Sequence, residues 1–231
     1  MCQNDSSCTA CCGTLNLKLS PNGIKVLLDE RTVACPNQGV ASHFELVEYR
    51  KKQEKIEKSI KRHDASIYVC PFVGWIAPGR AGCLIHPVRT GRANSQNASF
   101  YGATICQNYD CRAKEVEQKK QNPTEWFEAV ARWSNNDTVM YSRIIGDAML
   151  YRFLEQLGDL SLLLKRAEFV IRRLCFLRSQ EDVGPTSFEL PTFSKLDIHE
   201  YIDLLFTDEN RKLALDAVNA LEEIDLVDTK E

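Results

Sequence analysis

The distribution of cysteine is the feature that most constrains how this chain can fold. Of ten cysteines in 231 residues, only Cys175 lies beyond residue 111. The stretch from Cys70 to Cys111 carries four of them together with His86. The upstream cysteines are Cys2, Cys8, Cys11, Cys12 and Cys35. The first half must therefore accommodate a high density of sulfur, whereas Cys175 stands in an apolar run and is expected to be a core residue.

The chemical role of these thiols depends on the redox compartment. The N-terminal sequence MCQNDSSCTACCG has neither a basic region nor an apolar stretch, so no secretory signal peptide is expected. No run of 18 apolar residues occurs, so no membrane-spanning helix is expected. We predict a cytoplasmic protein, in which clustered thiols are more often metal ligands than disulfides. A disulfide framework is the alternative for an extracytoplasmic location.

Several cysteine pairs have spacings that suit metal coordination. Two residues separate Cys8 from Cys11, a usual spacing for two ligands on one tight turn. Cys12 follows directly, and because neighbouring side chains diverge, the adjacent pair suits two ions or a bridged site better than one ion. Cys70 and Cys83 would face each other across a hairpin. The last pair, about one helical turn apart, is Cys106 and Cys111.

Residues 1–35 and 64–111 contain too little apolar periodicity to fold alone, and a bound metal would link them. Thiolate-only sites suit zinc and iron–sulfur clusters alike. The ferredoxin-type cysteine run is absent, so zinc is the first prediction, and iron or an iron–sulfur cluster is the alternative. The predicted metal ligands are Cys2, Cys8, Cys11, Cys12, Cys70, Cys83, Cys106 and Cys111.

Other residues near the cysteines keep two interpretations each. Cys35 is a spare ligand or a free thiol. His86 is a ligand or a hydrogen-bonded histidine. Three arginines are charges near the sulfurs or solvated surface groups, and these are Arg80, Arg89 and Arg92.

The secondary structure of the first half is predicted as mixed. The alternating leucines of 15–19 suit a short strand. Ser20-Pro21 indicates a helix start, with a hairpin at Asn22-Gly23 as the alternative. A helix is expected over 41–63, resting on the sparse apolar positions Phe44, Val47, Ile56 and Ile60. A hairpin is expected over 66–86, with arms at 67–69 and 83–85 and its turn at Pro78-Gly79. A polar loop over 87–99 and a short helix carrying Cys106 and Cys111 would follow.

The second half is predicted to be a small helical bundle. Helices are expected from Asn122, over 137–158, over 160–178, over 196–205 and over 207–226. Asp147 and Glu155 in the second of these helices could serve as carboxylate metal ligands, but without a Glu-x-x-His partner they are expected to be solvent-facing carboxylates. The predicted fold is therefore mostly α, with a small irregular α+β cysteine-rich domain over 1–115 and a helical domain over 116–231.

The cysteine motifs resemble the YkgJ-type family of zinc- or iron-chelating cysteine-cluster proteins. The resemblance covers about residues 2–111. The matching motifs are Cys2, Cys8, Cys11 and Cys12, then Cys70-Pro71-Phe72-Val73, then Cys83-Leu84-Ile85-His86-Pro87 with Arg89, then Cys106 and Cys111. Five residues separate the first two cysteines instead of the family's two, and His86 stands where the family has tyrosine. The resemblance implies metal binding through these cysteines and leaves the helical half unexplained.

The predicted function is metal binding with a mainly structural or interaction role, and a protein partner is possible. An iron–sulfur or metal-dependent redox enzyme is the alternative, although no catalytic motif such as HExxH or GxGxxG appears. Nucleic acid is an unlikely partner, because the sequence pI is about 5.9 and lysines alternate with glutamates in the charged helix. No membrane association is expected.

Overall fold

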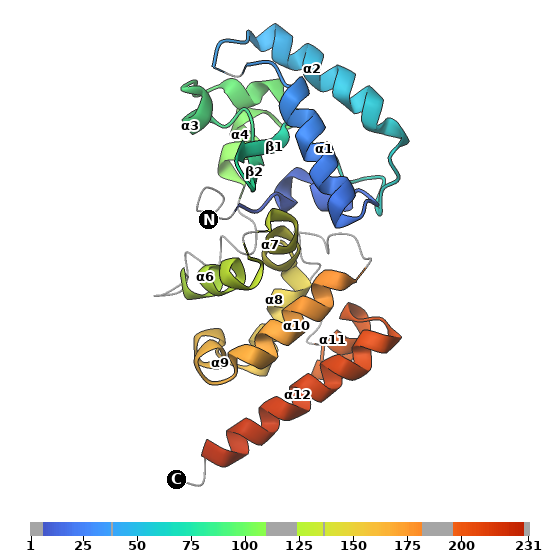
Figure 1. Ribbon diagram of the computed structural model, residues 1–231, viewed down its shortest axis with the longest axis vertical. Coiled ribbons are helices and arrows are strands. Elements are labelled where there is room, and N and C mark those ends of the chain that lie inside the picture. Colours follow the sequence, from blue (N-terminus) through green and yellow to red (C-terminus); the bar gives the residue numbers. More distant parts are fainter. Residues whose placement is uncertain (1–6, 38, 110–123, 136, 182–195, 229–231) are drawn as a thin grey trace.

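A computed structural model describes residues 7–37, 39–109, 124–135, 137–181 and 196–228, without the side chains of Thr124 and 222–228. Its structure is 66% helical, with eleven α-helices and one small two-stranded antiparallel sheet in the described part (Figure 1). The prediction of a mostly helical chain is confirmed. None of the described helices combines the length and apolar character needed to cross a membrane.

The first half combines short helices, 3-10 turns and the sheet. Its elements are η1 (Ala10–Cys12), η2 (Thr14–Asn16), α1 (Pro21–Ala34), α2 (His43–Ile56), η3 (Glu57–Ser59), β1 (Val73–Ala77), β2 (Arg80–Cys83), α3 (Pro87–Thr90), η4 (Ser95–Ala98) and α4 (Gly102–Asn108). The second half is helical. Its elements are α6 (Thr124–Trp133), α7 (Thr138–Ile145), α8 (Ala148–Leu157), α9 (Leu160–Arg166), α10 (Glu168–Gln180), α11 (Ile198–Leu205) and α12 (Asp208–Asp228).

The helix predicted after Ser20 is confirmed as α1, because the Ser20 hydroxyl accepts the N–H of Gly23 at 3.1 Å. The strand predicted for 15–19 is wrong. Asn16 ends η2 instead, and its side chain hydrogen-bonds both the N–H and the carbonyl of Asp64. These bonds tie the segment to a distant loop, and only Leu17 forms an isolated bridge.

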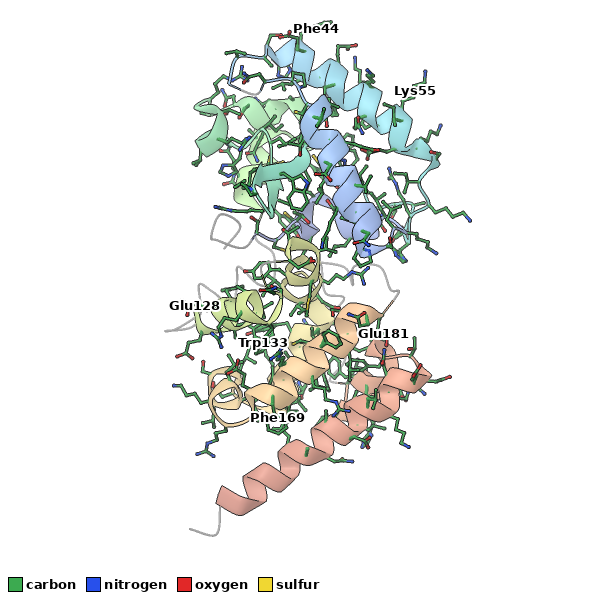
Figure 2. The ribbon with its side chains drawn as sticks, in the orientation of Figure 1. Phe44, Lys55, Glu128, Trp133, Phe169 and Glu181 are labelled. Atoms are coloured by element: carbon green, nitrogen blue, oxygen red, sulfur yellow. The ribbon has the colours of Figure 1, made fainter. Side chains whose placement is uncertain are left out.

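Helix α2 forms within the range predicted over 41–63 but ends at Ile56, and its buried face is not the expected one. Phe44 and Ile56 are 70% and 56% exposed, and Figure 2 shows Phe44 at the outer edge of the molecule. The buried side chains are those of Leu46, Tyr49 and Gln53. Tyr49 and Gln53 make buried hydrogen bonds, so polar contacts rather than the sparse apolar positions set the rotation of this helix.

The hairpin turns at Pro78-Gly79 as predicted, but its first strand begins later than expected and its second strand begins earlier. Val73 pairs with Cys83, so Cys83 ends β2 while Cys70 lies before β1. Gly74 is needed here, because a Cβ at this position would lie 2.6 Å from the Thr32 hydroxyl on α1. The following segment is not a loop throughout, since it forms α3 and η4.

The helix predicted over 137–158 is two helices, α7 and α8. Asp147 starts α8, because its carboxylate accepts the N–H groups of Met149 and Leu150. At the junction, a Cβ on Gly146 would lie 2.3 Å from the Ala10 Cβ, so the break lets the N-terminal segment approach. The helix predicted over 160–178 is likewise divided, into α9 and α10, at Ala167.

Four clusters of buried apolar side chains hold the chain together. The largest lies within the helices of the second half, and Cys175 is completely buried in it as predicted. Three smaller clusters lie in the first half, and one of them includes Val139 of α7. Helix α7 therefore lies between the cysteine-rich half and the other helices (Figure 1). The boundary predicted at residue 115 lies outside the described residues, and the division into two domains stays a prediction.

Candidate functional site

Five cysteines from four separate segments converge in the first half. Cys11 and Cys12 lie in η1, Cys70 precedes β1, Cys83 ends β2 and Cys106 lies in α4. The N–H of Cys70 donates to the carbonyl of Cys12 at 2.9 Å, which joins the first two segments directly. These thiols influence one another electrostatically. Cys70 and Cys83 raise the pKa of Cys12, and Cys106 raises the pKa of Cys83. Five of the eight predicted ligands therefore lie near enough to influence one another's pKa.

The adjacent sulfurs of Cys11 and Cys12 lie 4.0 Å apart and share a hydrogen bond. The expectation that these side chains diverge is wrong, because the 3-10 turn brings them to the same side. The shared bond lowers the pKa of Cys11. The same bond raises the pKa of Cys12 well above its usual value, and burial and the neighbouring thiols raise it further. Cys11 is exposed, so this pair connects the site with solvent.

The deeper thiols are held neutral by their surroundings. Burial raises the pKa of Cys70 well above the usual range, and the charge of Cys83 adds to this effect. Burial likewise raises the pKa of Cys83 to about 12. A buried thiolate among other thiols lacks hydration and is repelled by its neighbours. A divalent ion would supply the compensating positive charge that lets several of them ionise.

Two polar side chains contact the sulfurs. The Gln96 amide nitrogen lies 3.7 Å from the Cys83 sulfur, and the Ser99 hydroxyl lies 3.5 Å from the Cys106 sulfur. Both residues belong to the segment interpreted from sequence as a plain polar loop. Nothing in their spacing distinguishes them from other polar loop residues, so sequence reasoning missed them.

Aromatic rings lie beside the thiols. Tyr68 stacks on Phe100 with ring centroids 4.7 Å apart, and Tyr101 meets both rings edge-on. Burial raises the pKa of the Tyr101 hydroxyl, and the thiols of Cys70 and Cys106 add to the increase. These three rings therefore form an aromatic cluster at the border of the site, in which Phe100 and Tyr101 are exposed.

The other predicted ligands have different positions. Cys8 packs against the helical core, and its sulfur lies 3.7 Å from the place of a Cβ on Gly146. Cys2 and Cys111 lie outside the described residues. Cys35 is buried in the same apolar cluster as Cys70.

His86 begins α3, because its Nδ1 accepts the N–H of Val88 at 3.3 Å. Burial lowers its pKa. His86 is therefore a hydrogen-bonded residue at the start of α3 in this structure.

The three arginines considered near the sulfurs donate hydrogen bonds to oxygen atoms. Arg89 donates to the carbonyl of Ile76 at 2.9 Å, and Arg92 donates to that of Ala41 at 2.6 Å. Arg80 donates to the Ser7 hydroxyl at 3.2 Å. A different cation, the buried Arg31 of α1, lowers the pKa of Cys70 and so opposes the effect of burial. Arg31 is far from the cysteine motifs in sequence, so no local signal pointed to it.

The sequence suggested that the carboxylate of Asp147 faces solvent, and this prediction is wrong. It is 7% exposed and pairs with Arg178, whose Nε lies 2.7 Å from Oδ2. Arg178 also donates to the carbonyl of Leu205 at 2.8 Å. This buried pair joins α8, α10 and α11 and belongs to the helical core rather than to the thiol site.

Gly13 lets η1 lie against the segment that leads to Cys70. Its φ is +73°, and a Cβ there would lie 2.2 Å from the Tyr68 carbonyl oxygen. We expect Gly13→Ala to lower the free energy of unfolding by about 1–3 kcal/mol, through left-handed strain and this backbone clash. Urea denaturation followed by circular dichroism measures the change.

Gly79→Ala is the matched control for this prediction. Gly79 has a similar φ of +69° but nothing within 4 Å of its added Cβ. Gly79→Ala should therefore show the destabilisation caused by left-handed backbone strain, without the loss caused by a clash. Equal losses in the two variants would contradict the close approach of η1 to Tyr68.

In the described part of the chain, no three His, Cys, Asp or Glu side chains are grouped closely enough to hold a metal ion. Comparisons with family models, curated proteins and solved structures found no match. The resemblance to the YkgJ-type family therefore stays a prediction. What the geometry offers chemically is a group of neighbouring thiols, one pair of which reaches solvent.

Proposed function

We propose that this chain binds a metal ion through cysteine thiolates, and that the ion links the segments of the first half. Zinc is the first candidate and iron or an iron–sulfur cluster the second. The observation that carries the proposal is the convergence of thiols from four segments. They are Cys11, Cys12, Cys70, Cys83 and Cys106. Cys2, Cys8 and Cys111 stay predicted ligands.

Ion geometry agrees with part of this arrangement. A tetrahedral zinc ion with Zn–S bonds of about 2.3 Å holds its sulfurs about 3.8 Å apart. The Cys11 and Cys12 sulfurs, at 4.0 Å, already have nearly this separation. The remaining sulfurs must move closer, because the described residues contain no complete ligand group. Binding would therefore tighten the site as well as ionise it.

The role proposed for the ion is structural. The first half has three small apolar clusters instead of one large core. An ion bound by η1, the segment before β1, β2 and α4 would add coordination bonds to elements that otherwise pack around a small apolar cluster. A protein partner and a redox activity stay predictions.

Elemental analysis of protein purified without oxygen and without metal-chelating resin tests the proposal. We expect stoichiometric zinc and a colourless protein, because zinc has no visible transitions. Iron with absorbance in the visible range would favour the iron–sulfur alternative. Failure of zinc-free, reduced protein to take up either metal would contradict the proposal.

A further inference from the structure

Helix α10 carries an exposed stripe of aromatic and cationic side chains, which we call the α10 face. Phe169, at the start of the helix (Figure 2), is 63% exposed and Phe176 is 51% exposed. Arg172 and Arg173 between them are exposed as well. These four positions have the three- and four-residue spacing of one side of a helix. A rise of about 1.5 Å per residue places the two phenylalanines about 10 Å apart along the axis, with both arginines between them.

The other side of α10 belongs to the helical core. Val170, Ile171 and Leu174 are at most 1% exposed and lie in the largest apolar cluster. The helix also packs against α7, α9 and α12. The core therefore fixes the position and rotation of α10, and it leaves the α10 face directed to solvent.

The charge around the α10 face is opposite in sign to that of the whole chain. Residues 160–180 contain five Lys/Arg and one Asp/Glu, whereas the chain has a formal net charge of −3. The single acid, Glu168, accepts hydrogen bonds from Arg132 at 2.9 Å and from the Trp133 ring nitrogen at 2.7 Å. The carboxylate is therefore already bonded to α6, and the α10 face presents a local excess of positive charge. Charge complementarity indicates an anionic partner.

Rings and guanidinium groups on one face suit a ligand that has both flat bases and phosphates. Exposed aromatic side chains stack on unpaired bases, and arginine binds phosphate through its planar fork. In a duplex the bases already stack on one another, so the rings would have no partner there. A lipid surface takes up the apolar side of an amphipathic helix, whereas the apolar side of α10 is buried in the core.

We propose that the α10 face binds single-stranded nucleic acid. Phe169 and Phe176 stack on bases, and Arg172 and Arg173 contact the phosphates between them. This site lies in the helical half and is independent of the metal-binding proposal. The acidic balance of the chain, which predicts nucleic acid as an unlikely partner, includes charges far from α10. Exposed charges more than about 8 Å apart are largely screened at physiological ionic strength, so the local charge decides.

Fluorescence anisotropy of short labelled oligouridine and oligothymidine, measured with the full chain at several salt concentrations, tests the proposal. Arg172→Gln with Arg173→Gln removes two positive charges. Phe169→Leu with Phe176→Leu keeps apolar side chains and removes the rings. All four side chains are exposed, so both double variants should fold and melt like the wild type.

A matched control makes the same kinds of change on another helix. Phe44 of α2 is 70% exposed, and Lys55 of α2 is exposed as well. Figure 2 shows both on the helix at the opposite end of the molecule from the C-terminal helices, far from Phe169. Phe44→Leu with Lys55→Gln should therefore bind both oligonucleotides as the wild type does.

We expect the wild type to bind single strands, more tightly at low salt. The arginine variant should bind about 10-fold more weakly or less, and its plot of log affinity against log salt should be shallower by about 1.4, since each phosphate contact to a single strand contributes about 0.7. The phenylalanine variant should lose about 10-fold for each ring and keep the salt dependence of the wild type. A preference for oligouridine over oligothymidine, if it depends on the same residues, supports RNA as the ligand.

Several results would overturn the proposal. The first is a wild type that binds neither oligonucleotide at low salt. The second is equal displacement of the bound strand by a duplex or by polyglutamate, which would show a general attraction to polyanions. Binding to phosphatidylserine vesicles that the phenylalanine variant loses, with unchanged oligonucleotide binding, would assign the face to a lipid surface. A smaller mass in solution for the phenylalanine variant than for the wild type would show that the face joins two copies of the chain.

Discussion

Replacement of Cys70 by serine is expected to weaken metal binding about 100-fold, enough to lose the ion to a competing chelator, and to destabilise the first half of the chain. Structural zinc sites contribute about 10–16 kcal/mol, so one of four thiolates accounts for about 3 kcal/mol, or about 100-fold in affinity. Cys70 joins η1 through its backbone and lies beside β1, so its loss should separate these segments. Bound zinc, measured by elemental analysis, and thermal unfolding with and without zinc give the two readouts.

Cys175→Ser is the control, because it makes the same chemical change at a buried thiol in the helical half. Cys175 is completely buried, and burial raises its pKa well above the usual range. Its replacement should cost some stability but leave bound metal unchanged. Retention of metal in Cys70→Ser, or loss of metal in Cys175→Ser, would show that the site is elsewhere.

Replacement of Asp147 by alanine is expected to lower the free energy of unfolding by about 3–5 kcal/mol, because it leaves the Arg178 guanidinium buried without its counter-charge. The same change removes the two hydrogen bonds that start α8. Asp147→Asn should retain part of this cap while losing the charge, so it separates the two contributions. Urea denaturation measures all three proteins.

An exposed ion pair provides the comparison for this prediction. Asp203 lies 3.1 Å from Arg211, with a side chain that is 64% exposed. Exposed pairs contribute at most about 1 kcal/mol, so Asp203→Ala should have a small effect. If Asp147→Ala and Asp203→Ala were equally mild, the buried pair would not support the helical core as inferred.

Local signals in the sequence predicted the helices well where the signal lies within a few residues. Ser20-Pro21 marks the start of α1, and its hydroxyl makes the capping bond that the pattern predicted. In α6, the helix expected from Asn122, the spacing of Trp126, Phe127 and Val130 places them on one side, and all three are buried. Such caps and stripes depend on neighbouring residues, so they can be recognised without knowing the rest of the fold.

Positions where distant segments meet were not predictable in the same way. The break between α7 and α8 accommodates Ala10, which is more than 130 residues away in the chain. The buried face of α2 includes Tyr49, whose hydroxyl donates to the carbonyl of Pro71 in a separate segment. Apolar periodicity reports neither contact, because each joins groups that are brought together only by folding.

The sequence by itself determined that the chain is mostly helical, that Cys175 is a core residue and that the first half is crowded with thiols. Only the tertiary structure decided which thiols become neighbours, that Cys8 lies against the helical core, and that Arg31 is buried in a pair with Glu57. The physical reason is the distance along the chain over which each interaction acts. Capping and periodicity act over one or two helical turns, whereas the grouping of sulfurs requires closing loops of tens of residues, which only the packing of the whole chain achieves.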